Sequence, residues 1–132
     1  MRTADEDGDV VLQEALEPST QWIDVLGSGD EGRVYLEVIA CDGLPNLDSP
    51  TFTNLNNLTD PFCCIIMEDS IVNTSFIKDD LSPRWMPNDR RAFILHASHP
   101  SSQVFIGVFD HDKANSRGFP YASNFMIPSA VS

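Results

Sequence analysis

Four aspartates stand beside strand-like apolar runs, where carboxylates from separate loops can meet. They are Asp48, Asp60, Asp110 and Asp112. Asp110 and Asp112 are two residues apart, so on an extended chain their carboxylates point the same way while His111 turns aside. Gathered carboxylates repel one another, and a divalent cation relieves that repulsion; calcium suits such a site better than magnesium because it accepts many oxygens in irregular geometry. Spacing alone leaves a second interpretation open, in which these aspartates only cap turns.

Short β-rich runs separated by turn residues must position these aspartates. The run 34–41 places alternate apolar residues on one face, and the run 62–67 is apolar on both faces, as a central sandwich strand can be. The other predicted strands are residues 22–26, 71–77, 92–95, 104–109 and 125–127. No helical period extends over a dozen residues, and at most one turn of helix is expected, over 13–16. The pattern predicts an all-β sandwich, in which neighbouring loops collect at one end.

The net charge limits the classes of partner that the chain is expected to bind. Its 132 residues include 20 acidic residues and 8 Lys or Arg, which gives a formal net charge of −12. No basic face is offered to phosphate, so nucleic acid is not an expected partner. An anionic membrane should also repel the chain unless bound cations reduce that repulsion. Acidic residues cluster at 5–9, which predicts a flexible, solvated segment over 1–20 and a folded domain over 21–132.

The thiols show no pattern typical of a disulfide framework or a zinc site. Cys41, Cys63 and Cys64 are an odd number without C-x-x-C spacing, and the adjacent pair points to opposite faces of a strand. All three are interpreted as buried, reduced thiols. The sequence contains no nucleophile elbow and no phosphate-binding glycine loop, so no catalytic residue is assigned. The first ten residues lack the apolar segment of a signal peptide, and the run 61–67 is too short to cross a bilayer, so a cytoplasmic protein is expected.

Three large side chains between the predicted strands are given structural interpretations. Trp85 follows a Ser-Pro turn and is expected to be a packing anchor. Arg90 and Arg91 are expected on a solvated face, paired with Asp89. No ligand is assigned to any of the three.

Four short motifs occur in an order that is similar to one known family. They are Leu-Pro-Asn-Leu-Asp at 44–48, Thr-Asp-Pro-Phe at 59–62, Leu-Ser-Pro-Arg-Trp at 81–85 and Val-Phe-Asp-His-Asp at 108–112. Together they resemble the C2 domain family from about residue 32 to 112, and more weakly to 128. The resemblance implies an eight-stranded antiparallel β-sandwich that holds calcium in a cup between its first and third loops. Residues 22–26 resemble the strand that closes this sandwich, which implies the permuted topology with that strand at the N-terminus.

The resemblance also implies a set of calcium ligands. The matched positions are Asp48 and Asp60 in loop one, Asp110 and Asp112 in loop three, and the main-chain oxygens of Leu47 and His111. The family usually has a fifth aspartate where this chain has Gly118, and Asn115 or Ser116 would have to offer a neutral oxygen instead. Because calcium affinity follows the charge and number of its ligands, one good site and one weak or absent site are expected.

Apolar and basic side chains flank the implied cup. Loop one, 49–59, is longer than the family usually has, and the candidate membrane contacts are Phe52, Leu55, Leu58, Lys113, Arg117 and Phe119. Apolar tips can enter the headgroup region while the cations meet lipid phosphates; the alternative is that the apolar side chains fold back and pack the loop. Lys78 is the only cation in the run 70–78, so the phosphoinositide site that the family often has there is not expected.

The expected function is calcium-dependent binding to anionic phospholipid, without catalysis. The module would recruit itself or an attached protein to a membrane when calcium rises, as a monomeric, peripheral cytoplasmic protein. The alternative is a degenerate C2 domain that binds a protein partner through its sheet surface without calcium. Gly118 favours this alternative and the four aspartates oppose it. A regulatory fragment of a larger lipid-modifying enzyme is also left open.

Overall fold

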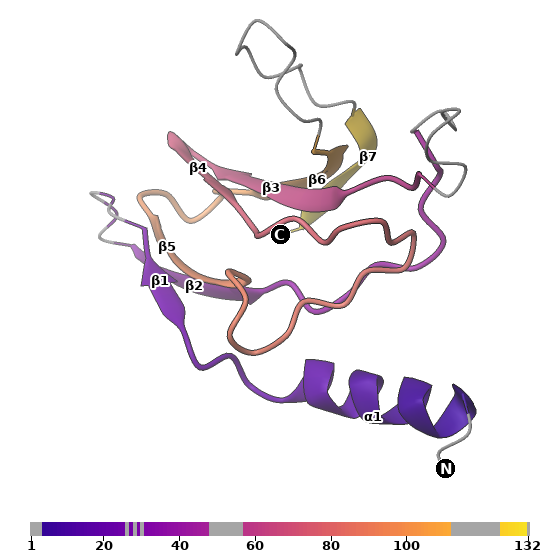
Figure 1. The fold of residues 1–132 in the computed structure, drawn as a ribbon. Helices are drawn as coiled ribbons and strands as arrows, with labels where there is room; N and C mark the ends of the chain where they lie inside the picture. Colours follow the sequence, from indigo (N-terminus) through magenta and orange to yellow (C-terminus); the bar gives the residue numbers. More distant parts are fainter. Residues whose placement is uncertain are drawn as a thin grey trace, which may run out of the picture.

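The structure is a computed structural model and describes residues 4–25, 27, 29, 31–47, 57–111 and 125–131. Its elements in chain order are α1 (Ala4–Leu16), β1 (Trp22–Asp24), β2 (Gly32–Glu37), β3 (Pro61–Met67), β4 (Ser70–Asn73), β5 (Ala92–Ala97), β6 (Val104–Asp110) and β7 (Phe125–Val131). The strands form two layers, and α1 lies beyond the layer that contains β1, β2 and β5 (Figure 1). The predicted all-β sandwich is confirmed.

One sheet has three strands in the order β1-β5-β2, and the other has four in the order β4-β3-β6-β7. Every neighbouring pair is antiparallel except one: β1 runs parallel to β5, with Trp22 opposite Ala92. The expectation of antiparallel pairing throughout therefore does not hold for β1. The seven strands lie in the described part of the chain, and the eighth strand and the permuted topology stay predictions.

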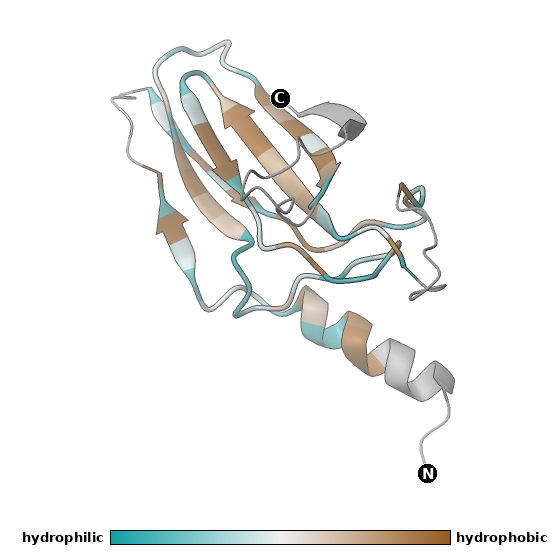
Figure 2. Cartoon of the chain, turned by 45° about the horizontal axis from the view of Figure 1, so that its top comes forward, coloured by the Kyte–Doolittle hydropathy of each residue, from teal (hydrophilic) through white to brown (hydrophobic). Residues whose placement is uncertain are grey.

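The core lies between the two sheets and follows the alternation of the strands. On β3, Cys63, Ile65 and Met67 are buried, while Ile66 between them is exposed on the outer face. Figure 2 shows the apolar residues concentrated on the strands. Trp85 is fully buried in this core, and its indole N–H donates to the carbonyl of Ser75 at 2.7 Å. Its expected role as a packing anchor is confirmed.

Helix α1 was not predicted beyond a single turn, and its attachment depends on Arg91. The guanidinium of Arg91 has no exposed surface; it donates to the carbonyls of Ala15 (3.0 Å) and Glu17 at the end of the helix, and forms an ion pair with Glu37 at 2.8 Å. The expectation that Arg91 lies on a solvated face beside Asp89 is therefore wrong. Because the last carbonyls of a helix lack partners within it, a buried cation that donates to them stabilises that end.

Candidate functional site

Asp60 and Asp110 lie together at one end of the four-stranded sheet. Asp60 directly precedes β3, Asp110 ends β6, and the strand register places Pro61 opposite Asp110. The backbone N–H of Asp60 donates to Asp110 Oδ1 at 3.0 Å, and the backbone N–H of His111 donates to the Asp60 carbonyl at 2.9 Å. Both aspartates are buried. The structure thus brings together one predicted ligand from loop one and one from loop three.

A third aspartate, Asp79, joins this arrangement. Its backbone N–H donates to Asp60 Oδ1 at 2.7 Å, and its own Oδ1 accepts from the N–H of Leu58 at 3.2 Å. Asp79 has a φ of 50°, the left-handed region that aspartate tolerates better than most residues. None of the four sequence motifs contains Asp79. A short polar side chain beside Asp80 in a turn was the one available signal, and it does not reveal which carboxylate the turn contacts.

Thr59 and Asn46 fix the base of loop one. The buried Thr59 Oγ1 accepts from the N–H of Leu47 at 2.8 Å and donates to the carbonyl of Pro45 at 3.1 Å. The N–H of Thr59 donates to Asn46 Oδ1 at 3.1 Å, and Asn46 Nδ2 donates to the carbonyl of Asn57 at 3.2 Å. These bonds hold the two ends of the loop side by side, next to Asp60. Both residues lie within the sequence motifs, but the motif pattern predicts no role for either of them.

Thr59→Val is expected to destabilise the domain by about 1–3 kcal/mol, because valine keeps the volume and leaves the Leu47 N–H and the Pro45 carbonyl without their partner. Urea unfolding measures the change. Thr20→Val is the matched control, since the exposed Thr20 hydroxyl makes a comparable bond to the Pro87 carbonyl at 3.1 Å; its effect should stay within about 0.5 kcal/mol. Equal losses in the two variants would show that the hydrogen bonds of Thr59 stabilise the domain no more than those of an exposed hydroxyl.

Some of the remaining predicted site residues lie within the described ranges and others lie outside them. Leu47 and His111 are exposed and Leu58 is half-buried. The His111 ring turns to the outer face of the sheet, where it stacks on Phe76 with ring centroids 4.1 Å apart, as alternation after Asp110 predicts. The residues outside the described ranges are Asp48, Phe52, Leu55, Asp112, Lys113, Asn115, Ser116, Arg117 and Phe119, and their roles stay predictions.

The donor chemistry fits a hard cation, but the set is incomplete within the described ranges. Buried carboxylate oxygens are ligands that calcium prefers. Among the residues that the structure places, no three acidic, His or Cys side chains converge closely enough to hold a metal ion. A calcium ion at Asp60 and Asp110 would therefore need the carboxylates of Asp48 and Asp112.

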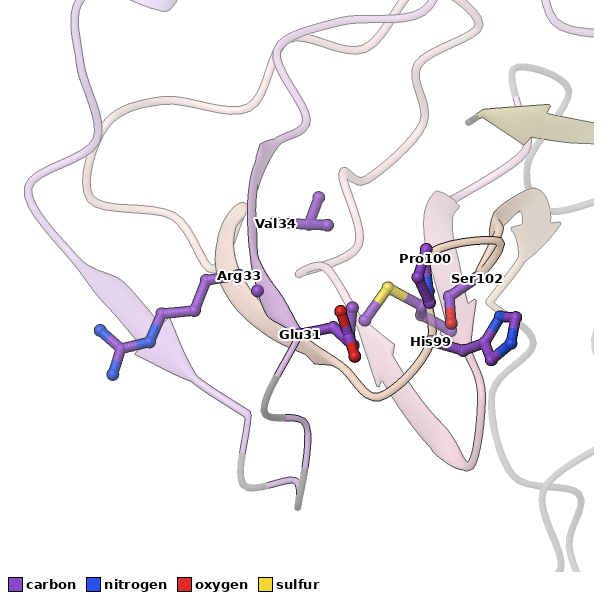
Figure 3. A pocket seen from close by; sticks show the side chains of 9 residues that line it. Glu31, Arg33, Val34, His99, Pro100 and Ser102 are labelled. Atoms are coloured by element: carbon purple, nitrogen blue, oxygen red, sulfur yellow. The ribbon is translucent and has the colours of Figure 1, made fainter.

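A pocket of about 290 Å³ lies at the other end of the sandwich and is separate from this site (Figure 3). Its lining includes Glu31, Arg33 and His99, together with Met67. Met67 ends β3, whereas Asp60 precedes its first residue. None of the predicted site residues that the structure describes lines this pocket. The part of the chain that is described also holds no helix long and apolar enough to cross a membrane.

The fold is a two-layer β-sandwich with two aspartates paired at one end. Comparison with known families identifies the family to which this fold belongs. The C2 domain family matches residues 32–120. The chain belongs to the C2 domain family. C2 domains are in general membrane-binding modules rather than enzymes.

Solved structures with the same fold come from extended synaptotagmins. The two tandem C2 domains of extended synaptotagmin 2, described as calcium bound, share 22% identity with a TM-score of 0.60; the match covers 76% of this chain and 34% of that chain. A C2 domain of a plant extended synaptotagmin 1 shares 19% identity with a TM-score of 0.59, covering 76% of this chain and 67% of that one. The match thus spans about a third of the first of these structures. No curated protein matches the chain.

Proposed function

We propose that this chain is a calcium-dependent module that binds anionic phospholipid and performs no catalysis. The observation that carries the proposal is the direct contact between Asp60 and Asp110, which joins the two loops that the family uses for calcium. The backbone N–H of Asp60 donates to the Asp110 carboxylate and the N–H of His111 donates to the Asp60 carbonyl, so the last residues of loop one are tied to the first residues of loop three. The calcium-bound state of one extended-synaptotagmin structure with this fold supports the same proposal.

The charge of the chain explains why a cation would control membrane binding. At a net charge of −12, the protein and an anionic surface repel each other. Asp48, Asp60, Asp110 and Asp112 would hold calcium, which then supplies positive charge at the cup and accepts lipid phosphate oxygens as further ligands. Bound calcium would thereby turn the electrostatic repulsion between the loops and the anionic membrane into attraction. Recruitment from the cytoplasm would follow a rise in calcium.

The side chains beside the cup would set how deeply the domain docks. Phe52, Leu55 and Phe119 are the proposed apolar contacts, and Lys113 and Arg117 the proposed phosphate contacts. Leu58 is half-buried, and its N–H is held by Asp79, so its contribution to docking is smaller than that of a freely projecting side chain.

Calcium titration by isothermal calorimetry tests the site itself. Wild type should bind calcium with a dissociation constant on the order of tens to hundreds of micromolar, and Asp60→Asn should weaken binding by roughly tenfold or more because one charged ligand is lost. Asparagine keeps an acceptor for the N–H of Asp79, so the fold is preserved. Asp69→Asn removes the same charge from the exposed turn after β3 and should change the affinity by less than about twofold. No heat from wild type at millimolar calcium, or equal losses in both variants, would reject the site.

A second candidate function rests on the outer face of the four-stranded sheet. Ile71, Ile66 and Phe105 are direct cross-strand neighbours on β4, β3 and β6, with exposed fractions of 66%, 38% and 48%. A contiguous exposed apolar row of this kind is typical of protein-interaction surfaces. It favours a calcium-independent module that binds a protein partner through this sheet. Such binding would persist in chelator and would be lost in Ile66→Lys, which a pull-down with a defined partner measures.

A further inference from the structure

The pocket at the end of the sandwich opposite Asp60 is formed where three segments of the chain meet. The start of β2, the last residue of β3 and the connection from β5 to β6 line a volume of about 290 Å³ (Figure 3). Its walls are apolar at Val34, Met67, Ala97 and Pro100. This volume is close to the lower limit of small-ligand sites, which lies near about 300 Å³. The pocket therefore suits a small molecule or one side chain of a partner.

The charge that faces this pocket is the carboxylate of Glu31. Figure 3 shows Glu31 directed to the same side as Pro100 and Ser102. The side chain of Arg33 extends in the opposite direction, because the next residue, Val34, packs against the core and successive residues of a strand point to opposite faces. Among the described residues, none forms a hydrogen bond or an ion pair with the Glu31 carboxylate. The carboxylate can thus pair with a bound cation.

Backbone contacts hold Glu31 at this position. Glu31 precedes β2, so the alternation of the strand does not set the direction of its side chain. Its N–H donates to the carbonyl of Ala97 at 3.0 Å. Gly29 fixes the same segment, because a Cβ at this position would lie 2.5 Å from the backbone of Ala97, and only glycine permits that approach. The backbone of Glu31 is therefore fixed before a ligand binds, which reduces the conformational entropy that binding costs.

Ser102 offers a ligand an acceptor and not a donor. A hydroxyl has one hydrogen, and that of Ser102 donates to Glu68 Oε1, so towards a ligand Ser102 Oγ can only accept. Glu68 Oε1 also accepts from the N–H of Ser98 at 2.7 Å, and the two bonds, that from Ser102 first, hold the pKa of Glu68 below its usual range. A second carboxylate thus stays ionised beside the pocket. These groups favour a ligand that donates hydrogen bonds and carries positive charge.

We propose that this pocket binds a primary alkylammonium ion, the group that ends a free aliphatic amine or a lysine side chain. The ammonium pairs with Glu31 and donates to Ser102 Oγ, and the alkyl stem lies against the apolar walls. A quaternary ammonium is not the preferred ligand, because it is bound by a cage of Trp, Tyr or Phe rings, and none of these lies among the described residues that line the pocket. A metal ion does not fit either, since no three described acidic, His or Cys side chains converge to hold one.

This site is independent of the proposed calcium function. Asp60 precedes β3 and Met67 ends it, so the two sites lie about 20 Å apart along an extended strand. At this distance, water and salt screen most of the interaction between exposed charges. A bound amine should therefore leave the dissociation constant for calcium within about twofold of its value without the amine. Each of the two sites can thus fail its test without the other.

Chemical-shift titration of the isotope-labelled full chain tests the site with two amines, pentylamine and a lysine blocked at its α-amino and carboxyl groups. Both should shift amide signals within 31–34 and 97–102 and at Met67, with a dissociation constant on the order of 1 mM. Pentanol, which has the same alkyl stem without charge, should bind at least about threefold more weakly than pentylamine. Tighter binding of pentylamine assigns the site to a free amine, and tighter binding of the blocked lysine assigns it to a protein side chain. Equal binding of pentanol, or no shifts at amine concentrations far above this value, would overturn the proposal.

Gly32→Leu blocks the pocket without changing its charge. Gly32 lies on the same face of β2 as Val34 and opposite Ala97, and a Cβ at this position meets nothing within 4 Å. The leucine side chain should therefore enter the pocket, keep the fold and reduce amine binding by at least about tenfold. Amine binding as tight as that of wild type in this variant would place the amine elsewhere and reject the site.

Glu31→Gln keeps the shape of the side chain and removes its charge. Amine binding should weaken by about threefold or more, the modest effect expected of an exposed carboxylate. Glu14→Gln is the matched control, because Glu14 is exposed on α1 and does not line the pocket; it should change amine binding by less than about twofold. Equal effects of the two substitutions would show that the net charge of the chain, rather than the pocket, attracts the amine, and would contradict the proposal.

Discussion

Replacing Arg91 with alanine is expected to destabilise the domain by about 3–5 kcal/mol. The guanidinium is fully buried and serves four partners: the carboxylate of Glu37 and the carbonyls of Ala15, Glu17 and Trp85. Alanine leaves these acceptors without donors and leaves Glu37 without its cation. A marginally stable domain has little more free energy of unfolding than this loss, so much of the variant should be unfolded at about 37 °C.

Urea unfolding of the wild type and the variant measures the change, and Arg90→Ala is the matched control. Arg90 is exposed and adjacent in sequence, so its removal should change the free energy of unfolding by less than about 0.5 kcal/mol. Arg91→Lys gives a second measurement if the alanine variant does not fold. Lysine keeps the charge but lacks the planar fork, so the amide hydrogens of α1 should exchange faster than in wild type. Unchanged exchange in α1 would contradict the role of Arg91 as its anchor.

Trp85→Ala is the second large effect, with an expected loss of about 3–5 kcal/mol from the cavity and from the lost hydrogen bond to the Ser75 carbonyl. Trp85→Phe refills most of the volume and should recover all but about 1–3 kcal/mol, because the Ser75 carbonyl still lacks its donor. Trp22→Ala is the control: Trp22 is 42% exposed while Trp85 is 0% exposed. Thermal unfolding by circular dichroism measures all three. A larger loss at Trp22 than at Trp85 would contradict the assignment of the core.

The sequence predicted the parts of this fold that depend on local pattern. Alternation located β2 and β6, a run that is apolar on both faces located β3, and the position of Asp60 and Asp110 at the ends of two strands was enough to predict their meeting. The attachment of α1 could not be predicted, because it depends on Arg91 reaching Ala15 across a long sequence separation. The helix itself contains Gly8 and two adjacent valines, which are poor helix formers, so contact with the sandwich rather than local propensity decides its docking.

The candidate site can likewise be divided into residues that a local pattern predicts and residues that it does not. Loop-one and loop-three aspartates were visible as a motif, whereas Thr59 and Asp79 act through hydrogen bonds to backbone groups that no side-chain pattern reveals. The parallel pairing of β1 with β5 was also missed, since alternation fixes which face of a strand is buried but not which neighbour it chooses. In the same way, the burial of the thiols depends on the packing of the sheets: all three were expected to be buried, but only Cys63 is, and Cys41 and Cys64 are half-buried.

Co-sedimentation with liposomes tests the central claim most directly. Vesicles of phosphatidylcholine with phosphatidylserine are mixed with wild type, Asp110→Asn and the charge-matched control Asp69→Asn, each with millimolar calcium and with chelator. Wild type and Asp69→Asn should pellet with calcium only, and Asp110→Asn should stay in the supernatant in both conditions, although its amide oxygen can still accept from the N–H of Asp60. Pelleting of wild type that ignores chelator, or pelleting of Asp110→Asn equal to that of wild type, would contradict a calcium-dependent membrane module.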